Sequence, residues 1–269
     1  MESDPKWLAG IMLGMGTRFD SLPSRLREVS TELVLGDVPC LLVRGSEEPR
    51  PFLFWMHGRT ADKELDPGRY LRYVRKGIHV CAVDLPGHGA RCNAEMQDSS
   101  QALELILQMA GEIDGVLQRL GQIGGFDLNK AVLGGMSAGG MAAIQRLRVA
   151  HPFKAAVLEA TTGDYEPMRK MPLCLGLSEE AFHAINPIQH LAKWRDIPII
   201  AFHSRHDEWI PFSGQESFIH ALQKKAAIPK QIEFVTFDRT GAPYEHVGFG
   251  RESAFVKELQ VEFVLKCLK

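Results

Sequence analysis

Short runs of apolar residues, rich in β-branched and aromatic side chains, alternate along this chain with longer segments of helical period. Strand-like runs separated by helices are typical of a parallel sheet that is covered by helices on both faces. Eight runs are candidate strands: residues 33–35, 40–43, 52–56, 79–83, 131–133, 155–159, 199–202 and 232–237. The pattern therefore predicts an α/β fold, with a mostly parallel eight-stranded sheet flanked by helices.

The helical segments are marked by apolar residues that recur every three or four positions, most clearly at 100–120, 138–149 and 253–268. Residues 161–191 carry methionines and leucines without strand alternation, so we expect them to form a small cap over the sheet. No linker, repeat or low-complexity tract divides the 269 residues. This predicts a single domain over residues 1–269, with an N-terminal extension at 1–28 and a cap insertion at 161–191.

The charge balance argues against several classes of partner. A formal net charge of -2 provides no broad basic surface for nucleic acid or anionic lipid. The first residues are acidic, unlike a secretory signal, and no segment is apolar for long enough to span a bilayer. Five cysteines without CxxC spacing indicate reduced thiols. We therefore expect a cytoplasmic protein with no nucleic-acid or membrane partner.

The sharpest motif is a G-x-S-x-G sequence within residues 134–140, which read GGMSAGG. It directly follows the run 131–133 and directly precedes a helix, so Ser137 is predicted to lie on a sharp, strained turn. The glycines are required because side chains two residues before and after the serine would collide with neighbouring backbone. A serine becomes nucleophilic only when a base takes its proton and a third group holds that base.

Both partners occur further along the chain. Asp207 lies in the polar loop after the run 199–202, and His246 lies in the loop 241–248 after the run 232–237. The carboxyl ends of parallel strands are where ligand chemistry collects in α/β sheets. Asp207 has an alternative role as a helix cap before Pro211, and Asp164 is then the other candidate carboxylate. The spacing His203-x-x-His206-Asp207 resembles a metal cluster, but no distant ligand group matches it, so we expect no metal.

The order Ser137, Asp207, His246 resembles that of the α/β-hydrolase superfamily. Two more segments resemble its motifs: HGRT at 57–60 is similar to the His-Gly oxyanion loop, and DLPGHG at 84–89 to the turn after the fourth strand. The resemblance covers about residues 30–269 and implies the α/β-hydrolase fold. By the family pattern, the backbone N–H groups of Arg59 and Ala138 form the oxyanion hole.

Within the superfamily, the single catalytic domain with a short cap resembles the dienelactone-hydrolase-like and prolyl-oligopeptidase-like esterases. Dienelactone hydrolases proper use a cysteine nucleophile, whereas this chain has Ser137. A true oligopeptidase also carries an N-terminal propeller, and because no such segment is recognised in these residues we expect a different kind of enzyme. The resemblance therefore implies acyl chemistry on Ser137 but does not identify the substrate.

The substrate pocket is assigned from position alone. Trp209 and Tyr244 flank the predicted site and are candidates for its walls, or for ordinary packing. Met168 and Met171 suit an adaptable apolar cover, or a lid without specificity. The side chain of Arg59, with Arg205, is a candidate receptor for a carboxylate or phosphate on the substrate.

Together these features predict a serine hydrolase of the carboxylesterase type, which cleaves a small ester through an acyl-enzyme on Ser137 without metal or organic cofactor. One alternative is an acyltransferase, a perhydrolase or a small-amide hydrolase that uses the same site. A second alternative is a catalytically silent binding protein of the same fold. We expect a monomer or a homodimer; sequence does not choose between them.

Overall fold

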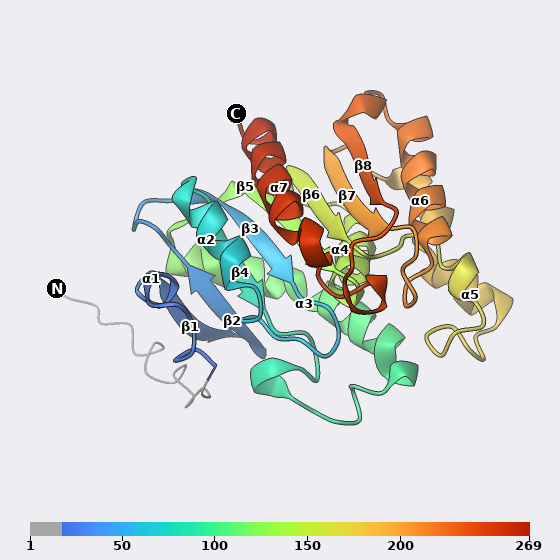
Figure 1. Ribbon diagram of the computed structural model, residues 1–269, viewed down its shortest axis with the longest axis horizontal. Coiled ribbons are helices and arrows are strands. Elements are labelled where there is room, and N and C mark those ends of the chain that lie inside the picture. The colour runs from blue at the N-terminus through green and yellow to red at the C-terminus, as the bar shows by residue number, and fades with distance from the viewer. Residues whose placement is uncertain (1–17) are drawn as a thin grey trace.

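The computed structural model describes residues 18–269, and these form one eight-stranded sheet with helices on both faces (Figure 1). The strand order is β1-β2-β4-β3-β5-β6-β7-β8. The strands are β1 (Ser30–Leu35), β2 (Val38–Val43), β3 (Arg50–Met56), β4 (His79–Val83), β5 (Phe126–Met136), β6 (Ala155–Glu159), β7 (Ile199–Ser204) and β8 (Ile232–Phe237). Each coincides with or contains a run predicted from the sequence, so the predicted fold class is confirmed.

The directions of the strands determine which loops lie at the same edge of the sheet. β1 and β2 pair antiparallel with each other, and β2 pairs antiparallel with β4. All the remaining pairs, from β4 to β8, are parallel. The loops that follow β3, β5, β6, β7 and β8 therefore emerge at the same edge of the sheet, and the candidate catalytic residues all lie on these loops.

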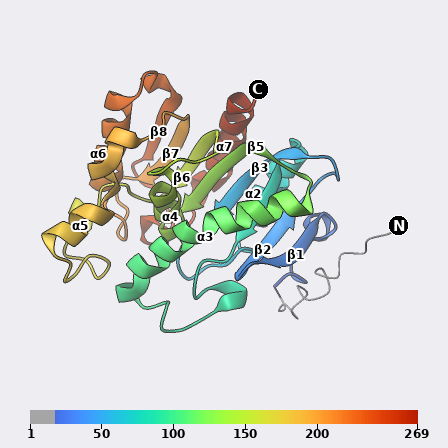
Figure 2. The same ribbon diagram turned by 180° about the vertical axis from the view of Figure 1, so that it is seen from behind.

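In the described part of the chain, seven α-helices connect and cover the strands: α1 (Ser24–Arg27), α2 (Pro67–Arg75), α3 (Ala102–Ile123), α4 (Ala138–Leu147), α5 (Glu179–Ile185), α6 (Phe212–Lys225) and α7 (Ser253–Cys267). Helices α2 and α7 cover one face (Figure 1), and α3 and α4 cover the other, which Figure 2 shows from behind. The three helices predicted most clearly from periodicity are α3, α4 and α7, each within three residues of its expected ends.

The two faces of the sheet bury separate cores because successive side chains of a strand point to opposite sides. On β3, Phe52, Phe54 and Met56 belong to the core that also contains side chains of α3, α4 and α6. Their neighbours Leu53 and Trp55 pack with α2 and α7. Continuous burial on both faces explains why the central strands read as unbroken apolar runs rather than as alternating ones.

The predicted N-terminal extension is only partly visible, since residues 1–17 lie outside the described part of the chain. Within residues 18–28, Leu22 and Leu26 are buried in the core under α2. This part of the predicted extension therefore packs on the domain. None of the helices in residues 18–269 has the length and apolar character needed to cross a membrane.

Candidate active site

Ser137 lies between β5 and α4 in a conformation that few non-glycine residues adopt, with φ 51° and ψ -121°. Such backbone strain costs about 1–3 kcal/mol and persists only where the surroundings impose it. Here the Ser137 N–H donates to the Glu159 carbonyl oxygen at 2.9 Å, and the Thr161 hydroxyl donates to the Ser137 carbonyl oxygen at 2.8 Å. Neighbouring backbone and side chain therefore hold the strained turn from both sides.

The glycines that flank Ser137 are sterically required. A Cβ on Gly135 would lie less than 3.0 Å from the Gly139 backbone, and one on Gly139 would lie equally close to the carbonyl groups of Met56 and His57. Real Cβ atoms essentially never come so close to other atoms. The collisions predicted from the sequence are thus confirmed, and they show that the loop after β3 packs directly on the first turn of α4.

Asp207, in the loop after β7, is paired with His246. The Nδ1 atom of His246 lies 2.8 Å from Oδ2 of Asp207, and both side chains are buried. The other oxygen, Oδ1, accepts hydrogen bonds from the Trp209 N–H at 2.9 Å and the Ile210 N–H at 2.8 Å. Because a carboxylate only accepts, Nδ1 carries a proton, and in the neutral tautomer the lone pair of His246 is on Nε2.

His203 makes a second contact with the same carboxylate, which sequence reasoning had missed. Its Nε2 lies 3.0 Å from the Ile210 carbonyl oxygen and 3.3 Å from Oδ2 of Asp207. Burial alone would raise the pKa of Asp207, but the hydrogen bonds from His203 and His246 outweigh burial and lower it. His206 instead lies on the surface beside Asp238. Within residues 18–269 no group of three or more His, Cys, Asp or Glu side chains is arranged to hold a metal ion.

The loop that carries His246 is held by its neighbour Glu245, a residue that the sequence did not single out. The Glu245 carboxylate accepts the Thr240 and Gly241 N–H groups at 2.6 and 2.9 Å, and the Ser204 hydroxyl at 2.8 Å. Burial would raise the pKa of Glu245, but these hydrogen bonds lower it to about 2. The side chain thereby ties the His246 loop to the end of β7.

The His-Gly segment after β3 lies against the nucleophile. His57 accepts the Leu85 N–H at Nε2 over 3.1 Å, so its Nδ1 carries a proton, which it donates to the Gly58 carbonyl oxygen at 2.6 Å. Burial lowers the pKa of His57 to about 4, which keeps the ring neutral. A Cβ on Gly58 would lie 3.3 Å from Cβ of Ser137. The backbone of Arg59, the next residue, is thereby brought beside the turn that displays Ser137.

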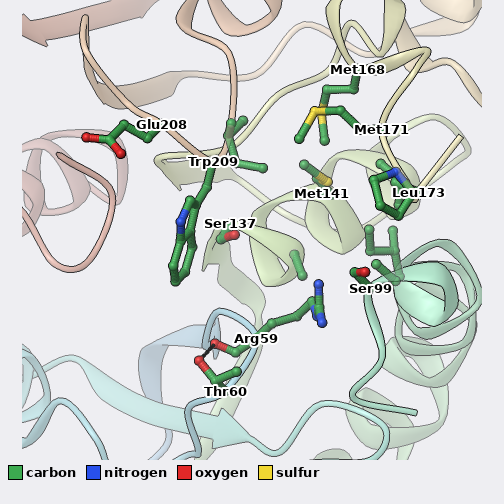
Figure 3. Close-up of a pocket in the computed structure, with 15 residues that line it drawn as sticks. Arg59, Thr60, Ser99, Ser137, Met141, Met168, Met171, Leu173, Glu208 and Trp209 are labelled. Atoms are coloured by element: carbon green, nitrogen blue, oxygen red, sulfur yellow. Dashed lines mark hydrogen bonds between the residues drawn. The ribbon is translucent and has the colours of Figure 1, made fainter. Parts of the chain in front are cut away.

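Two adjoining pockets open at this edge of the sheet. The larger, about 380 Å³, is lined by Ser137, Ala138, Arg59, Met168 and Met171 among others (Figure 3). The smaller, about 280 Å³, is lined by His246, Gly58 and Arg59 and extends toward α2 and α7. Trp209 lines both. The predicted oxyanion and apolar-cover residues thus share one cavity with Ser137.

Trp209 packs on the candidate base, whereas Tyr244 lies further out. The Trp209 ring lies 4.9 Å from the His246 ring and 5.0 Å from the Tyr244 ring. Tyr244 is 55% exposed and is not among the described residues that line either pocket. Its ring therefore packs on Trp209 rather than lining either pocket.

Two other candidates from the sequence lie away from the cavity. The Arg205 guanidinium lies over the Phe212 ring and donates to the Thr236 hydroxyl at 3.1 Å, so the expectation that it lies in the site with Arg59 is wrong. Asp164 accepts the Ser217 hydroxyl at 2.5 Å and caps the turn that begins at Glu166. The structure pairs Asp207 with His246 and directs Asp164 to this turn.

A buried ion pair supports the floor of the smaller pocket. Arg69 on α2 binds the Glu159 carboxylate with two nitrogens, at 2.8 and 2.9 Å, and its guanidinium stacks 3.8 Å from the Trp55 ring. The side-chain amide of Gln260 on α7 contacts both ions. Glu159 is also the residue whose carbonyl oxygen accepts the Ser137 N–H. The pair therefore joins α2, β6 and α7 directly beneath the Ser137 turn.

Comparison with known proteins agrees with this architecture. The sequence profile of the alpha/beta hydrolase family matches residues 41–255. A search among curated proteins found no match.

Several solved structures share the fold. A puromycin-hydrolyzing peptidase of Mycobacterium tuberculosis is similar with a TM-score of 0.72 and 18% identity over 89% of this chain, which spans 39% of the peptidase. TT1662 from Thermus thermophilus has a TM-score of 0.70 and 18% identity, covering 89% of this chain and 98% of that one. Thermogutta terrifontis esterase 2, solved after phosphoramylation by tabun, has a TM-score of 0.66 and 19% identity, covering 88% and 94%.

Proposed function

Because the chain belongs to the alpha/beta hydrolase family, we propose that it is a serine hydrolase that cleaves small carboxylic esters through an acyl-enzyme on Ser137. The observation that carries the proposal is the 2.8 Å hydrogen bond between Asp207 and Nδ1 of His246, at the same sheet edge as the strained Ser137 turn. In the neutral ring this bond places the proton on Nδ1, so that Nε2 offers the lone pair that a general base needs.

The proposed reaction has two steps. His246 takes the Ser137 proton while Oγ attacks the ester carbonyl carbon, and the negative charge on the carbonyl oxygen is held by the N–H groups of Ala138 and Arg59. His246 then gives the proton to the leaving alcohol. Water repeats the sequence and releases the acid and free Ser137. Asp207 stays ionised throughout and stabilises the imidazolium, which agrees with its lowered pKa.

Two features of the site favour oxyanion stabilisation at this position. Ala138 is the first residue of α4, so its N–H is one of the free donors at the positive end of the helix. Gly58 and Gly139 let the Arg59 backbone approach the same turn. Loss of one such donor lowers kcat by about 100- to 1,000-fold in serine hydrolases where it has been measured.

The proposal is tested with a fluorophosphonate probe and matched substrates. The probe should label the wild-type protein and leave Ser137→Ala unlabelled, with both proteins showing the same circular dichroism spectrum. A panel of p-nitrophenyl esters of increasing acyl length, beside the matching p-nitroanilides, then decides between ester and amide. Substantial ester turnover by Ser137→Ala would reject Ser137 as the nucleophile.

A further inference from the structure

The side chain of Arg59 ends in the pocket that Ser137 lines, and it lacks an anionic partner there. Its Nη2 donates to the Gln97 carbonyl oxygen, whereas its Nε is buried without a hydrogen-bond partner. No carboxylate of residues 18–269 lies within salt-bridge distance of this guanidinium. Burial lowers the pKa of Arg59, and the exposed Asp98 offsets this only in part. A half-buried guanidinium without a carboxylate partner favours binding of an anion, because a buried charge is costly in free energy until it is paired.

The rest of this pocket is apolar. Ile106, Met141, Met168 and Leu173 contribute much of its wall. Of the fifteen described residues that line it, Arg59 is the single cation and Glu208 the single anion. Figure 3 shows the Arg59 guanidinium directed toward Ser99, across the cavity from the methionines, while the Glu208 carboxylate points away from the cavity. The pocket therefore combines apolar walls with the positive charge of the Arg59 guanidinium.

The position of His246 indicates which part of an ester occupies this pocket. His246 lines the smaller pocket and is not among the described residues that line the larger one. In the proposed reaction His246 must protonate the leaving alcohol, so the alcohol lies on the side of the smaller pocket. The larger pocket is then left for the acyl chain.

We infer that the acyl chain carries a terminal carboxylate that binds the Arg59 side chain, so that the substrates are monoesters of aliphatic dicarboxylic acids. This inference rests on the proposed function. The ester C–O bond breaks, a C–O bond to water oxygen forms, and the products are an alcohol, a dicarboxylate and one released proton. A planar guanidinium matches a carboxylate in both charge and hydrogen-bond geometry.

The first experiment compares matched ethyl esters on the wild-type protein. Monoethyl glutarate, adipate and pimelate are each compared with the ester whose free carboxylate is replaced by a carboxamide, and the released ethanol is measured. The pairs differ in charge and not in length. At the best length we expect kcat/KM to favour the carboxylate by about tenfold or more, the effect of one charged hydrogen bond.

The second experiment replaces the side chain of Arg59 and retains its backbone N–H. In Arg59→Met the carboxylate-to-carboxamide ratio of kcat/KM should fall on the order of 10- to 100-fold. Arg205→Met is the matched control, because the Arg205 guanidinium lies over Phe212, outside both pockets, and the ratio should stay at the wild-type value.

The outcomes separate this inference from the proposed function. Hydrolysis of both members of each pair at equal rates would overturn the inference and leave the serine hydrolase standing. A wild-type preference that survives Arg59→Met would overturn the role of Arg59. Absence of all ester and amide hydrolysis, together with absence of fluorophosphonate labelling, would reject the proposed function itself. If the melting curve shows that Arg59→Met does not fold, the test rests on the carboxylate-to-carboxamide ratio of kcat/KM in the wild-type protein: a ratio of about ten or more supports the inference, and a ratio near one overturns it.

Discussion

The carboxylate of Asp207 binds His246 and His203 through one oxygen, Oδ2, and two backbone N–H groups through the other. Both carboxylate oxygens therefore have hydrogen-bond partners, and the His246 ring cannot turn without losing a buried hydrogen bond. Such a bond to a charged group contributes about 1.5–3 kcal/mol.

Replacing Asp207 by asparagine should lower kcat by about ten-thousand-fold with little change in KM, because an amide NH₂ facing Nδ1 would favour the wrong tautomer of His246. The asparagine oxygen can still accept the Trp209 and Ile210 N–H groups, so the fold should persist. Asp164→Asn is the matched control and should keep its activity, since Asp164 contacts Ser217 instead. The measurement is steady-state ester hydrolysis. Equal losses in the two variants would contradict the assignment.

Gly139→Ala should abolish ester hydrolysis and destabilise the protein by about 1–3 kcal/mol, because the new methyl group would overpack against the Met56 and His57 carbonyl groups. The control is Gly111→Ala on the exposed side of α3, where the added methyl would meet nothing within 4 Å. That variant should gain about 0.5–1 kcal/mol from helix propensity. Urea unfolding at neutral pH measures both changes. Full activity in Gly139→Ala would show that the loop and turn are not in contact.

Arg69→Met should lower the free energy of unfolding by about 3–5 kcal/mol, because it leaves the buried Glu159 carboxylate without its counter-ion. Arg72, three residues later on α2, makes a partly exposed ion pair with Glu258 and provides the control. Arg72→Met should change stability by about 1 kcal/mol or less. Chemical unfolding of both variants measures these changes in the free energy of unfolding. Similar losses in the two variants would contradict the assignment of Arg69–Glu159 as a buried pair and Arg72–Glu258 as a partly exposed one.

Trp209→Ala should raise KM for esters roughly three- to tenfold, corresponding to the loss of an aromatic contact of about 0.5–1.5 kcal/mol. The ring lines both pockets and packs on His246, so its removal takes away part of the wall of each. Tyr244→Ala should have a smaller effect, because Tyr244 lies outside both pockets. The measurement is KM for a series of esters that differ in their alcohol and acyl groups. A larger rise of KM in Tyr244→Ala than in Trp209→Ala would argue against Trp209 as the residue that lines the pockets.

Stability should fall as the pH decreases from 6.5 to 4. Burial lowers the pKa of His57 and of His151 from 6.5 to about 4. Between pH 6.5 and pH 4 these histidines bind protons in the unfolded chain but not in the folded chain, so protonation favours unfolding. Above pH 6.5 both histidines are neutral in both states, and they no longer make the stability depend on pH. Denaturant unfolding across this range measures the slope. In His57→Gln the slope should decrease by about 1.4 kcal/mol per pH unit at most, and an unchanged slope would show that His57 titrates normally.

The sequence predicted the eight strands, three main helices and the position of each candidate catalytic residue at a strand end. Most of these features are local, because burial on both faces produces continuous apolar runs. The glycines around Ser137 also reflect a contact with a distant part of the chain, since a Cβ on Gly139 would collide with the carbonyl groups of Met56 and His57. The order of the motifs then placed their loops on one edge, because parallel strands share the direction of their carboxyl ends.

The partners of polar side chains were decided only by the tertiary structure. Glu245 and His203 hold the ends of the Asp207–His246 pair, Arg205 turns away from the site, and Arg69 reaches Glu159 across 90 positions of sequence. No periodicity predicts such contacts, because a loop side chain takes its direction from whichever distant element packs against it. A buried charge must find a partner, but only the assembled fold determines which residue is near enough to serve.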